Sequence, residues 1–157
     1  MPHEKLALEA AFDPERSLVR KGQGHGVGHS SVQLAEQLLR RDEADDRNRA
    51  VGIVEAVLAE QYRQPGPDYG RFPMIVPETW RDLNGTLFLL SPMVAAVEEH
   101  AGKLPSALVA RLEESLRMAA VAVERRWDEE VFDLHRDITA YSNIFALYVQ
   151  SLMLLGA

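Results

Sequence analysis

Cysteine is absent from the 157-residue sequence, which excludes thiol nucleophiles, thiolate-bound zinc sites and disulfide scaffolds. Uninterrupted apolar runs of about 18 residues, the length that a membrane-spanning helix needs, are absent as well. The first nine residues, MPHEKLALE, mix both charges and lack the apolar stretch of a secretory signal. We therefore expect a cytoplasmic protein that does not span a membrane.

Positive charge is sparse and scattered. The chain has 17 Lys and Arg residues against 24 Asp and Glu residues, which gives a net charge of -7. The tight basic pairs are Arg40-Arg41 and Arg125-Arg126. Because affinity for nucleic acid rests largely on clustered lysine and arginine, a nucleic-acid partner is not expected.

Helical periodicity dominates the rest of the sequence. Hydrophobic residues make up 46% of the chain, and most of them recur at spacings of three and four, as on one face of an amphipathic helix. We predict helices over 3–12, from Ser30 or Ser31 to about Leu39, over 45–64, over 79–100 with a kink at Pro92, from Leu104-Pro105-Ser106 to a break at 127–140, and over 141–155. The main apolar stripes are Val32, Ala35, Leu38, Leu39; Ala50, Val51, Val54, Val57, Leu58, Gln61; Leu83, Leu87, Leu90, Val94, Val97; and Leu108, Leu112, Leu116, Ala119, Val123.

Strand signals are weak throughout, and Met74-Ile75-Val76 is the one piece that favours an extended conformation. The sequence therefore predicts an all-α fold of antiparallel helical hairpins. Residues 1–29 are predicted to be an N-terminal helix and a flexible loop, and residues 30–157 a helical-hairpin domain.

The glycine-rich stretch from Gly22 to His29 falls within that loop. His25 and His29 are four residues apart, a spacing that can bind a metal ion from a helix, but the glycines between them disfavour helix. No metal ion or cofactor is expected.

The segment 69–84 stands out because it carries many apolar and aromatic residues without helical periodicity. Tyr69, Phe72 and Trp80 are the side-chain types that stack on sugar rings, and Arg81 and Asp82 follow directly. Loops of this composition often carry function. We predict that the loops at 65–82 and 127–143 meet at one end of the helices.

Two short motifs carry a family resemblance. One is Trp80-Arg-Asp-Leu-Asn84, where the aromatic-rich loop leads into a helix. The other is Tyr141-Ser-Asn-Ile144, at the start of the last predicted helix. Together they resemble bacterial (α/α) toroid proteins of the six-hairpin glycosidase-like class, whose relatives include glycoside hydrolases and polysaccharide lyases. The resemblance covers residues 30–157 and implies a partial (α/α) toroid, either a fragment of a larger chain or a homo-oligomer.

The resemblance also implies a site for an oligosaccharide or polysaccharide. Tyr69, Phe72, Trp80, Arg81 and Asn143 would bind the sugar. Catalytic candidates are Asp82, Asn84, His135 and Tyr141.

Two chemistries remain open for those catalytic candidates. Toroid lyases use Asn, His and Tyr on a uronate, and Asn84, His135 and Tyr141 supply these residue types. A hydrolase needs a pair of carboxylates, for which Asp82 could pair with Asp133, with Asp137, or with a residue of a missing C-terminal part.

The expected function is therefore carbohydrate binding or processing, with catalysis left open. The alternative is a non-enzymatic helical module that self-associates, or binds a protein partner, through an open apolar side formed by residues 83–97 and 144–155.

Overall fold

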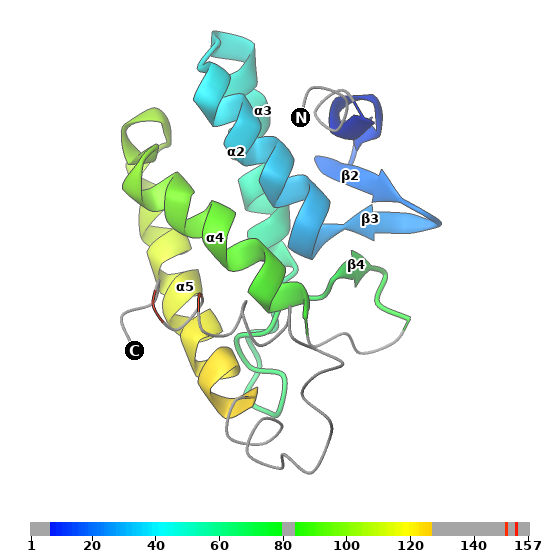
Figure 1. Ribbon diagram of the computed structural model, residues 1–157, viewed down its shortest axis with the longest axis vertical. Helices are drawn as coiled ribbons and strands as arrows, with labels where there is room; N and C mark the ends of the chain where they lie inside the picture. Colours follow the sequence, from blue (N-terminus) through cyan, green and yellow to red (C-terminus); the bar gives the residue numbers. More distant parts are fainter. Residues whose placement is uncertain (1–6, 80–83, 127–149, 151–152, 154–157) are drawn as a thin grey trace.

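The computed structural model describes residues 7–79 and 84–126 together with residues 150 and 153. Figure 1 shows the long helices packed side by side, with a small sheet next to the helix at residues 32–41. The elements after a helical turn at residues 7–10 are β1 (Phe12–Asp13), β2 (Leu18–Lys21), β3 (Gly24–Gly26), η1 (Val27–Ser31), α2 (Val32–Arg41), α3 (Ala44–Ala59), β4 (Ile75–Val76), α4 (Gly85–Glu98), η2 (Ala101–Lys103) and α5 (Ser106–Arg126).

The sheet has four antiparallel strands in the order β1-β2-β3-β4. Val19 of β2 pairs with Gly26 of β3, and Gly26 pairs in turn with Ile75 of β4. The fold is therefore mixed α/β, and both the all-α prediction and the (α/α) toroid resemblance are wrong. The extended piece predicted at Met74-Ile75-Val76 is confirmed as β4.

Glycine explains why the strands were hidden in the sequence. Gly22 has a φ of +62° at the first position of the two-residue turn between β2 and β3, where a type II′ hairpin turn requires glycine. A Cβ atom on Gly24 would lie 2.6 Å from the Val76 carbonyl oxygen, so the bare backbone permits the close approach of β4. The glycines that suggested a flexible loop instead permit a hairpin.

The hairpin continues into η1, a single π-helical turn that leads directly into α2. The Ser31 hydroxyl donates to the Gly26 carbonyl and accepts the backbone N–H of Val19 at 2.9 Å. One buried side chain thus joins β2, β3 and the start of α2.

Four of the predicted helices are confirmed in position. The stripe Val32, Ala35, Leu38 and Leu39 is buried in α2, and α5 buries Leu108, Leu112, Ala119 and Val123. The boundaries differ: the helix predicted over 45–64 ends at Ala59, and the helix predicted over 79–100 is helical over Gly85–Glu98, with Pro92 inside it. In the predicted helix 3–12, the described helical residues are 7–10, and β1 follows. The helix predicted over 141–155 lies outside the described residues except for residues 150 and 153, which are helical.

One hydrophobic core joins the sheet to the helices. Leu18 and Val19 of the sheet belong to the same buried cluster as Leu38 of α2, Ile53 of α3 and Leu90 of α4. The core therefore extends from the sheet through the space between the helices.

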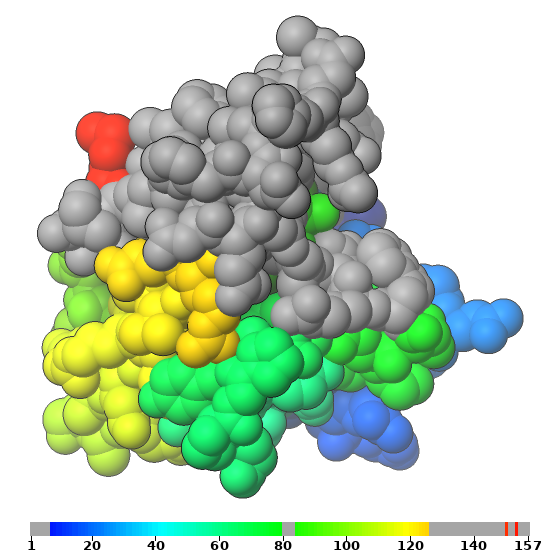
Figure 2. Space-filling view, turned by 90° about the horizontal axis from the view of Figure 1, so that it is seen from below, coloured from blue at the N-terminus to red at the C-terminus, as the bar shows by residue number. Residues whose placement is uncertain are grey.

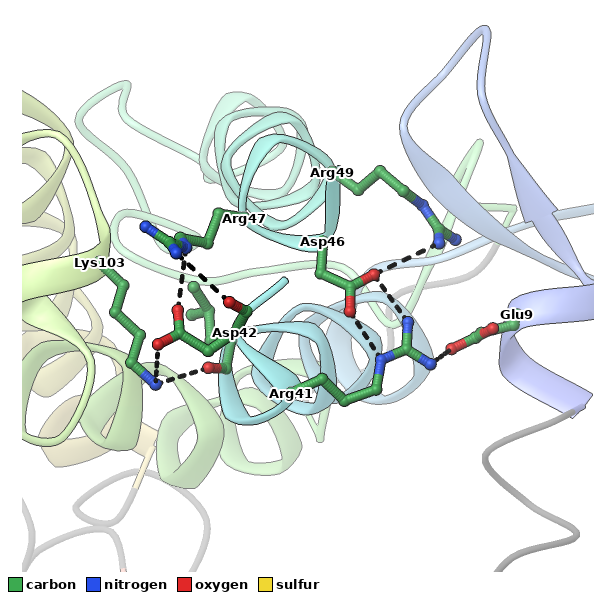
Figure 3. A network of polar contacts seen from close by, with 8 residues as sticks. Glu9, Arg41, Asp42, Asp46, Arg47, Arg49 and Lys103 are labelled. Carbon is green, nitrogen blue, oxygen red and sulfur yellow. Dashed lines mark hydrogen bonds and ion pairs between the residues drawn. The ribbon is translucent and has the colours of Figure 1, made fainter. Parts of the chain in front are cut away.

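A polar network fixes the turn between α2 and α3 to its surroundings (Figure 3). Both Asp46 oxygens accept hydrogen bonds from Arg41 at 2.7 Å, and Arg41 also pairs with Glu9. Asp42 ends α2 with a left-handed φ of 64°, and Lys103 donates to the Leu39 carbonyl at 2.8 Å. The Arg41 hydrogen bonds lower the pKa of Asp46, so this carboxylate stays ionised.

The described helices contain none that is both long enough and apolar enough to cross a membrane.

Candidate functional site

The candidate site is built on the segment 60–79, which connects α3 to β4 and α4. Figure 2 shows this segment, in green, against the orange end of α5. At its tip, Arg125 of α5 donates to the Gly66 carbonyl at 2.7 Å. At its base, the buried side chain of Gln61 donates to the carbonyl oxygens of Gly70 and Ser115, each at 3.0 Å. Residues 61–70 of the segment are thus held against α5 at two places.

Gly70 is the point of closest approach to α5. Its φ is +84°, and a Cβ atom there would lie 1.9 Å from the Met118 carbonyl oxygen. Only glycine both adopts this left-handed backbone conformation without strain and avoids the clash of a Cβ atom with α5. This glycine turns the chain so that Arg71 points into the protein.

Arg71 organises the polar side chains of the segment. Its Nη1 and Nη2 atoms donate to the two Glu78 oxygens at 2.7 and 2.8 Å, and its Nε atom donates to Asp68 at 2.9 Å. The guanidinium carbon lies 4.5 Å from the centre of the Tyr62 ring, and the Tyr62 hydroxyl donates to Glu78 at 2.6 Å. We call Tyr62, Asp68, Arg71 and Glu78 the Arg71 cluster.

The Arg71 cluster is partly open to solvent. The Arg71 side chain is 6% exposed, whereas the Asp68 and Glu78 side chains are 32% and 14% exposed. The cation is therefore internal and the carboxylates lie nearer the surface.

Charge states in the cluster follow from its contacts. Burial alone would lower the pKa of Arg71, but the hydrogen bonds and charge of Glu78, and then those of Asp68, raise it above its ordinary value. The hydrogen bond to Glu78, followed by burial, raises the pKa of Tyr62. Tyr62 therefore keeps its proton and acts as a donor.

The next stretch, 72–76, wedges between η1 and the start of α4. The Phe72 backbone N–H donates to Thr86 Oγ1 at 2.9 Å, and the Met74 carbonyl accepts the Val27 N–H at 2.9 Å. Gly85 makes room for this stretch, since a Cβ atom on it would lie 2.5 Å from the Phe72 carbonyl oxygen. The peptide bond between Val76 and Pro77 is cis.

The first turn of α4 carries two further side chains of interest. Asn84 is half-buried at the N-cap position, and its carbonyl accepts the Phe88 N–H at 3.2 Å. The Phe88 ring contacts His29 of η1 edge-on, with ring centres 5.5 Å apart. Residues from η1 and α4 thus meet beside the segment 72–76.

The structure locates three of the nine residues that the sequence nominates. Tyr69 is half-buried in the segment 60–79, and Asn84 begins α4. Phe72 is completely buried in the core, so its ring has no face available to a ligand. The others, Trp80, Arg81, Asp82, His135, Tyr141 and Asn143, lie outside the described residues. The meeting of the two loops at 65–82 and 127–143 therefore stays a prediction.

The members of the Arg71 cluster were missed by sequence reasoning. Each is a single polar residue in an irregular segment, where no periodicity shows which way a side chain points. The nearest signal is the density of glycine and proline around Arg71, which indicates a tightly turned chain.

Within the described ranges, no group of three or more His, Asp or Glu side chains is placed to hold a metal ion. The His25 and His29 pair accordingly forms no such group there.

Comparison with known proteins gives one family. The family model described as a domain of unknown function, DUF8769, matches residues 6–154. No curated protein and no solved structure matches the chain.

Proposed function

We propose that this chain, which belongs to the DUF8769 family, binds oligosaccharides at the segment between α3 and α4. The surface would comprise the exposed parts of the Arg71 cluster, Tyr69, and the residues that lead into α4. Sugars offer many hydroxyl groups, which carboxylates and amides bind, and flat apolar ring faces, which aromatic side chains cover.

The observation that carries the proposal is that Arg71 donates hydrogen bonds to both Glu78 and Asp68. The bidentate Arg71–Glu78 pair fixes the planes of both groups, and such pairs add geometric specificity as well as energy. Binding sites gain affinity when their polar groups are held in place before the ligand arrives. The Arg71 cluster supplies such fixed groups.

The sequence adds the aromatic component. Trp80 and Asp82 lie in the sequence between the segment that carries Glu78 and the N-cap residue Asn84. Our proposal assigns Trp80 and Tyr69 to the sugar face, and Asp82 and Asn84 to its hydroxyl groups. The same proposal has a catalytic part, which is hydrolysis or elimination of the bound sugar. The residues assigned to this part are Asp82, Asn84, His135 and Tyr141.

Calorimetric titration of the full chain tests the proposal. The probes are purified neutral oligosaccharides of cellulose, xylan and chitin, and acidic oligosaccharides of alginate and pectin. We expect at least one class to bind, and Trp80→Ala or Tyr69→Ala to weaken binding about tenfold, which corresponds to about 1.4 kcal/mol.

The matched control is Val121→Ala, at a residue 40% exposed on α5. This variant should bind as the parent does. The proposal would be refuted if none of the probes binds, or if the Trp80 and Tyr69 variants bind with the same affinity as the parent protein.

Self-association is the second candidate function. The described part of α4 is already covered within the chain, with Leu87, Leu89, Leu90, Met93 and Val94 all buried. Met153, in the C-terminal segment, is 76% exposed, and this exposed apolar side chain supports an interface there. Light scattering after size exclusion tests it: a concentration-independent monomer would exclude self-association, and a dimer lost in Met153→Asp would support it.

A further inference from the structure

A second polar cluster lies on the sheet. Arg20 and His25 are direct cross-strand partners, and Asp13 is paired with Leu18, two residues before Arg20. Because side chains two residues apart share one face of a strand, Asp13, Arg20 and His25 lie on the same face. None of these residues belongs to the Arg71 cluster.

Asp13 orients the His25 ring. His25 Nε2 lies 3.0 Å from Asp13 Oδ2, and the same oxygen accepts a hydrogen bond from Arg20 Nε at 3.2 Å. The His25 hydrogen bond, with help from the Glu15 N–H and Arg20, lowers the pKa of Asp13 to about 2. An ionised carboxylate only accepts hydrogen bonds, so the Nε2 atom carries the hydrogen.

In the neutral ring, whose single hydrogen is on Nε2, the Nδ1 atom keeps its lone pair. His25 Nδ1 makes no hydrogen bond within the described part of the chain. The fully buried polar atoms that lack a partner there do not include Nδ1, so this atom is not fully buried. The His25 side chain is 15% exposed and the neighbouring Arg20 side chain 67% exposed. The His25 ring is thus held by Asp13, and its cross-strand partner Arg20, on the same face of the sheet, holds the same carboxylate oxygen.

We propose that His25 is a phosphoryl-accepting site, at which Nδ1 takes a phosphoryl group from a small phosphoramidate and Arg20 binds the phosphoryl oxygens. A phosphoryl group matches the chemistry of both His25 and Arg20. Its phosphorus is an electrophile for the imidazole, and its anionic oxygens can accept hydrogen bonds from the guanidinium group.

The reaction balances with the groups present. The donor reacts in the form whose nitrogen is protonated: the Nδ1 lone pair attacks phosphorus, the P–N bond breaks, and the nitrogen leaves with the bonding pair as a neutral amine. The phosphorylated ring becomes a cation that keeps its hydrogen on Nε2, directed at the Asp13 carboxylate. Asp13 therefore acts as a positioning residue that also stabilises the charged product.

The test uses the full chain and phosphoramidate itself at neutral pH. Phosphorus NMR and mass spectrometry under alkaline conditions, which preserve phosphohistidine, identify the modified residue and the initial rate. We expect one phosphoryl group on His25, none there in His25→Gln, and a rate about 10–100-fold lower in Asp13→Asn, the range known for carboxylates that orient metal-ligating histidines.

Arg20→Gln and Arg16→Gln form a charge-matched pair, because both residues are exposed on neighbouring parts of the hairpin region. The Arg20 variant should react severalfold more slowly than the Arg16 variant. This pair decides the matter even if circular dichroism shows that Asp13→Asn is unfolded.

Asp13, Arg20 and His25 could instead serve only to link β1 to β3, and this structural role predicts different results. Phosphate spread evenly over the histidines, or equal rates in the Arg20 and Arg16 variants, would overturn the proposal. So would an unchanged rate in a folded Asp13→Asn variant.

Discussion

Gln61 and Ser115, 54 residues apart, exchange two hydrogen bonds inside the protein. The Ser115 hydroxyl donates to Gln61 Oε1 at 2.8 Å, and Gln61 Nε2 donates to the Ser115 carbonyl at 3.0 Å. Gln61 is 5% exposed and Ser115 is completely buried. This pair joins the first residues after α3 to the middle of α5, and it fixes the base of the segment that bears the Arg71 cluster.

Ser115→Ala should destabilise the fold by about 1–3 kcal/mol, because it leaves Gln61 Oε1 buried without a donor. Urea unfolding measures the loss. Ser106→Ala, at an exposed serine of the same helix, is the control and should change the free energy of unfolding by less than about 0.5 kcal/mol. Equal values for the two variants would show that the hydrogen bond contributes nothing to stability.

Gly70→Ala should cost about 2–4 kcal/mol, the sum of a left-handed backbone for an L-residue and overpacking against Met118. Gly102→Ala is the matched control, since a Cβ atom on Gly102 would meet nothing within 4 Å. Thermal unfolding of both variants checks the expectation. A Gly70 variant as stable as the Gly102 variant would contradict the close packing of the segment on α5.

Arg71→Met should destabilise by about 3–5 kcal/mol, because it leaves Glu78 and Asp68 without their buried counter-charge. Arg117→Met removes an arginine whose side chain is 73% exposed and which lies 3.7 Å from Glu113, so this control should cost at most about 1 kcal/mol. Urea unfolding compares the two. The double variant Arg71→Met, Glu78→Leu should recover part of the loss, and failure to recover it would argue against a paired cluster.

His100→Leu should raise the free energy of unfolding by about 1 kcal/mol. His100 is 6% exposed, and neither ring nitrogen has a hydrogen-bond partner in the described part of the chain. Replacing such a group by an apolar one of similar size removes an uncompensated desolvation cost. Chemical unfolding at neutral pH measures the change, and a large loss of stability would mean that the ring is satisfied in solution.

Acid should weaken the attachment of β1 through Asp13. The folded-state pKa of Asp13 is about 2, below its ordinary value of 3.8, so the group contributes stability above about pH 4 that is lost as the pH falls towards 2. Asp13→Asn should therefore flatten the dependence of the unfolding midpoint on pH in this range. Glu15→Gln, at a neighbouring exposed acid, should leave that part of the curve unchanged.

The helices could be predicted from the sequence because their signal is local. The spacing of Val32, Ala35, Leu38 and Leu39 defines a buried face without reference to any other part of the chain. Proline before Ser106 and the apolar stripe that follows define α5 in the same way. The exact ends of the helices could not be predicted as well. The predicted buried stripe continues to Gln61, whereas α3 ends at Ala59.

The strands and the candidate site depend on partners that lie far away in the sequence. β3 is three residues long and contains two glycines, and its pairing with β4 brings His25 opposite Val76. No local pattern indicates that contact. Arg71 is likewise one charge in a loop until Gly70 turns it inwards onto Glu78.

The sequence by itself determined the helical segments, the absence of thiol chemistry and the unusual composition of the stretch from Tyr69 to Asn84. Tertiary structure alone decided that the glycine-rich region is a β-hairpin, that Phe72 belongs to the core, and that Arg71 and His25 each have a carboxylate partner. The reason is physical: helical periodicity is set by neighbours within one or two turns, whereas strand pairing and buried charge pairs need contacts that form only when the whole chain has folded.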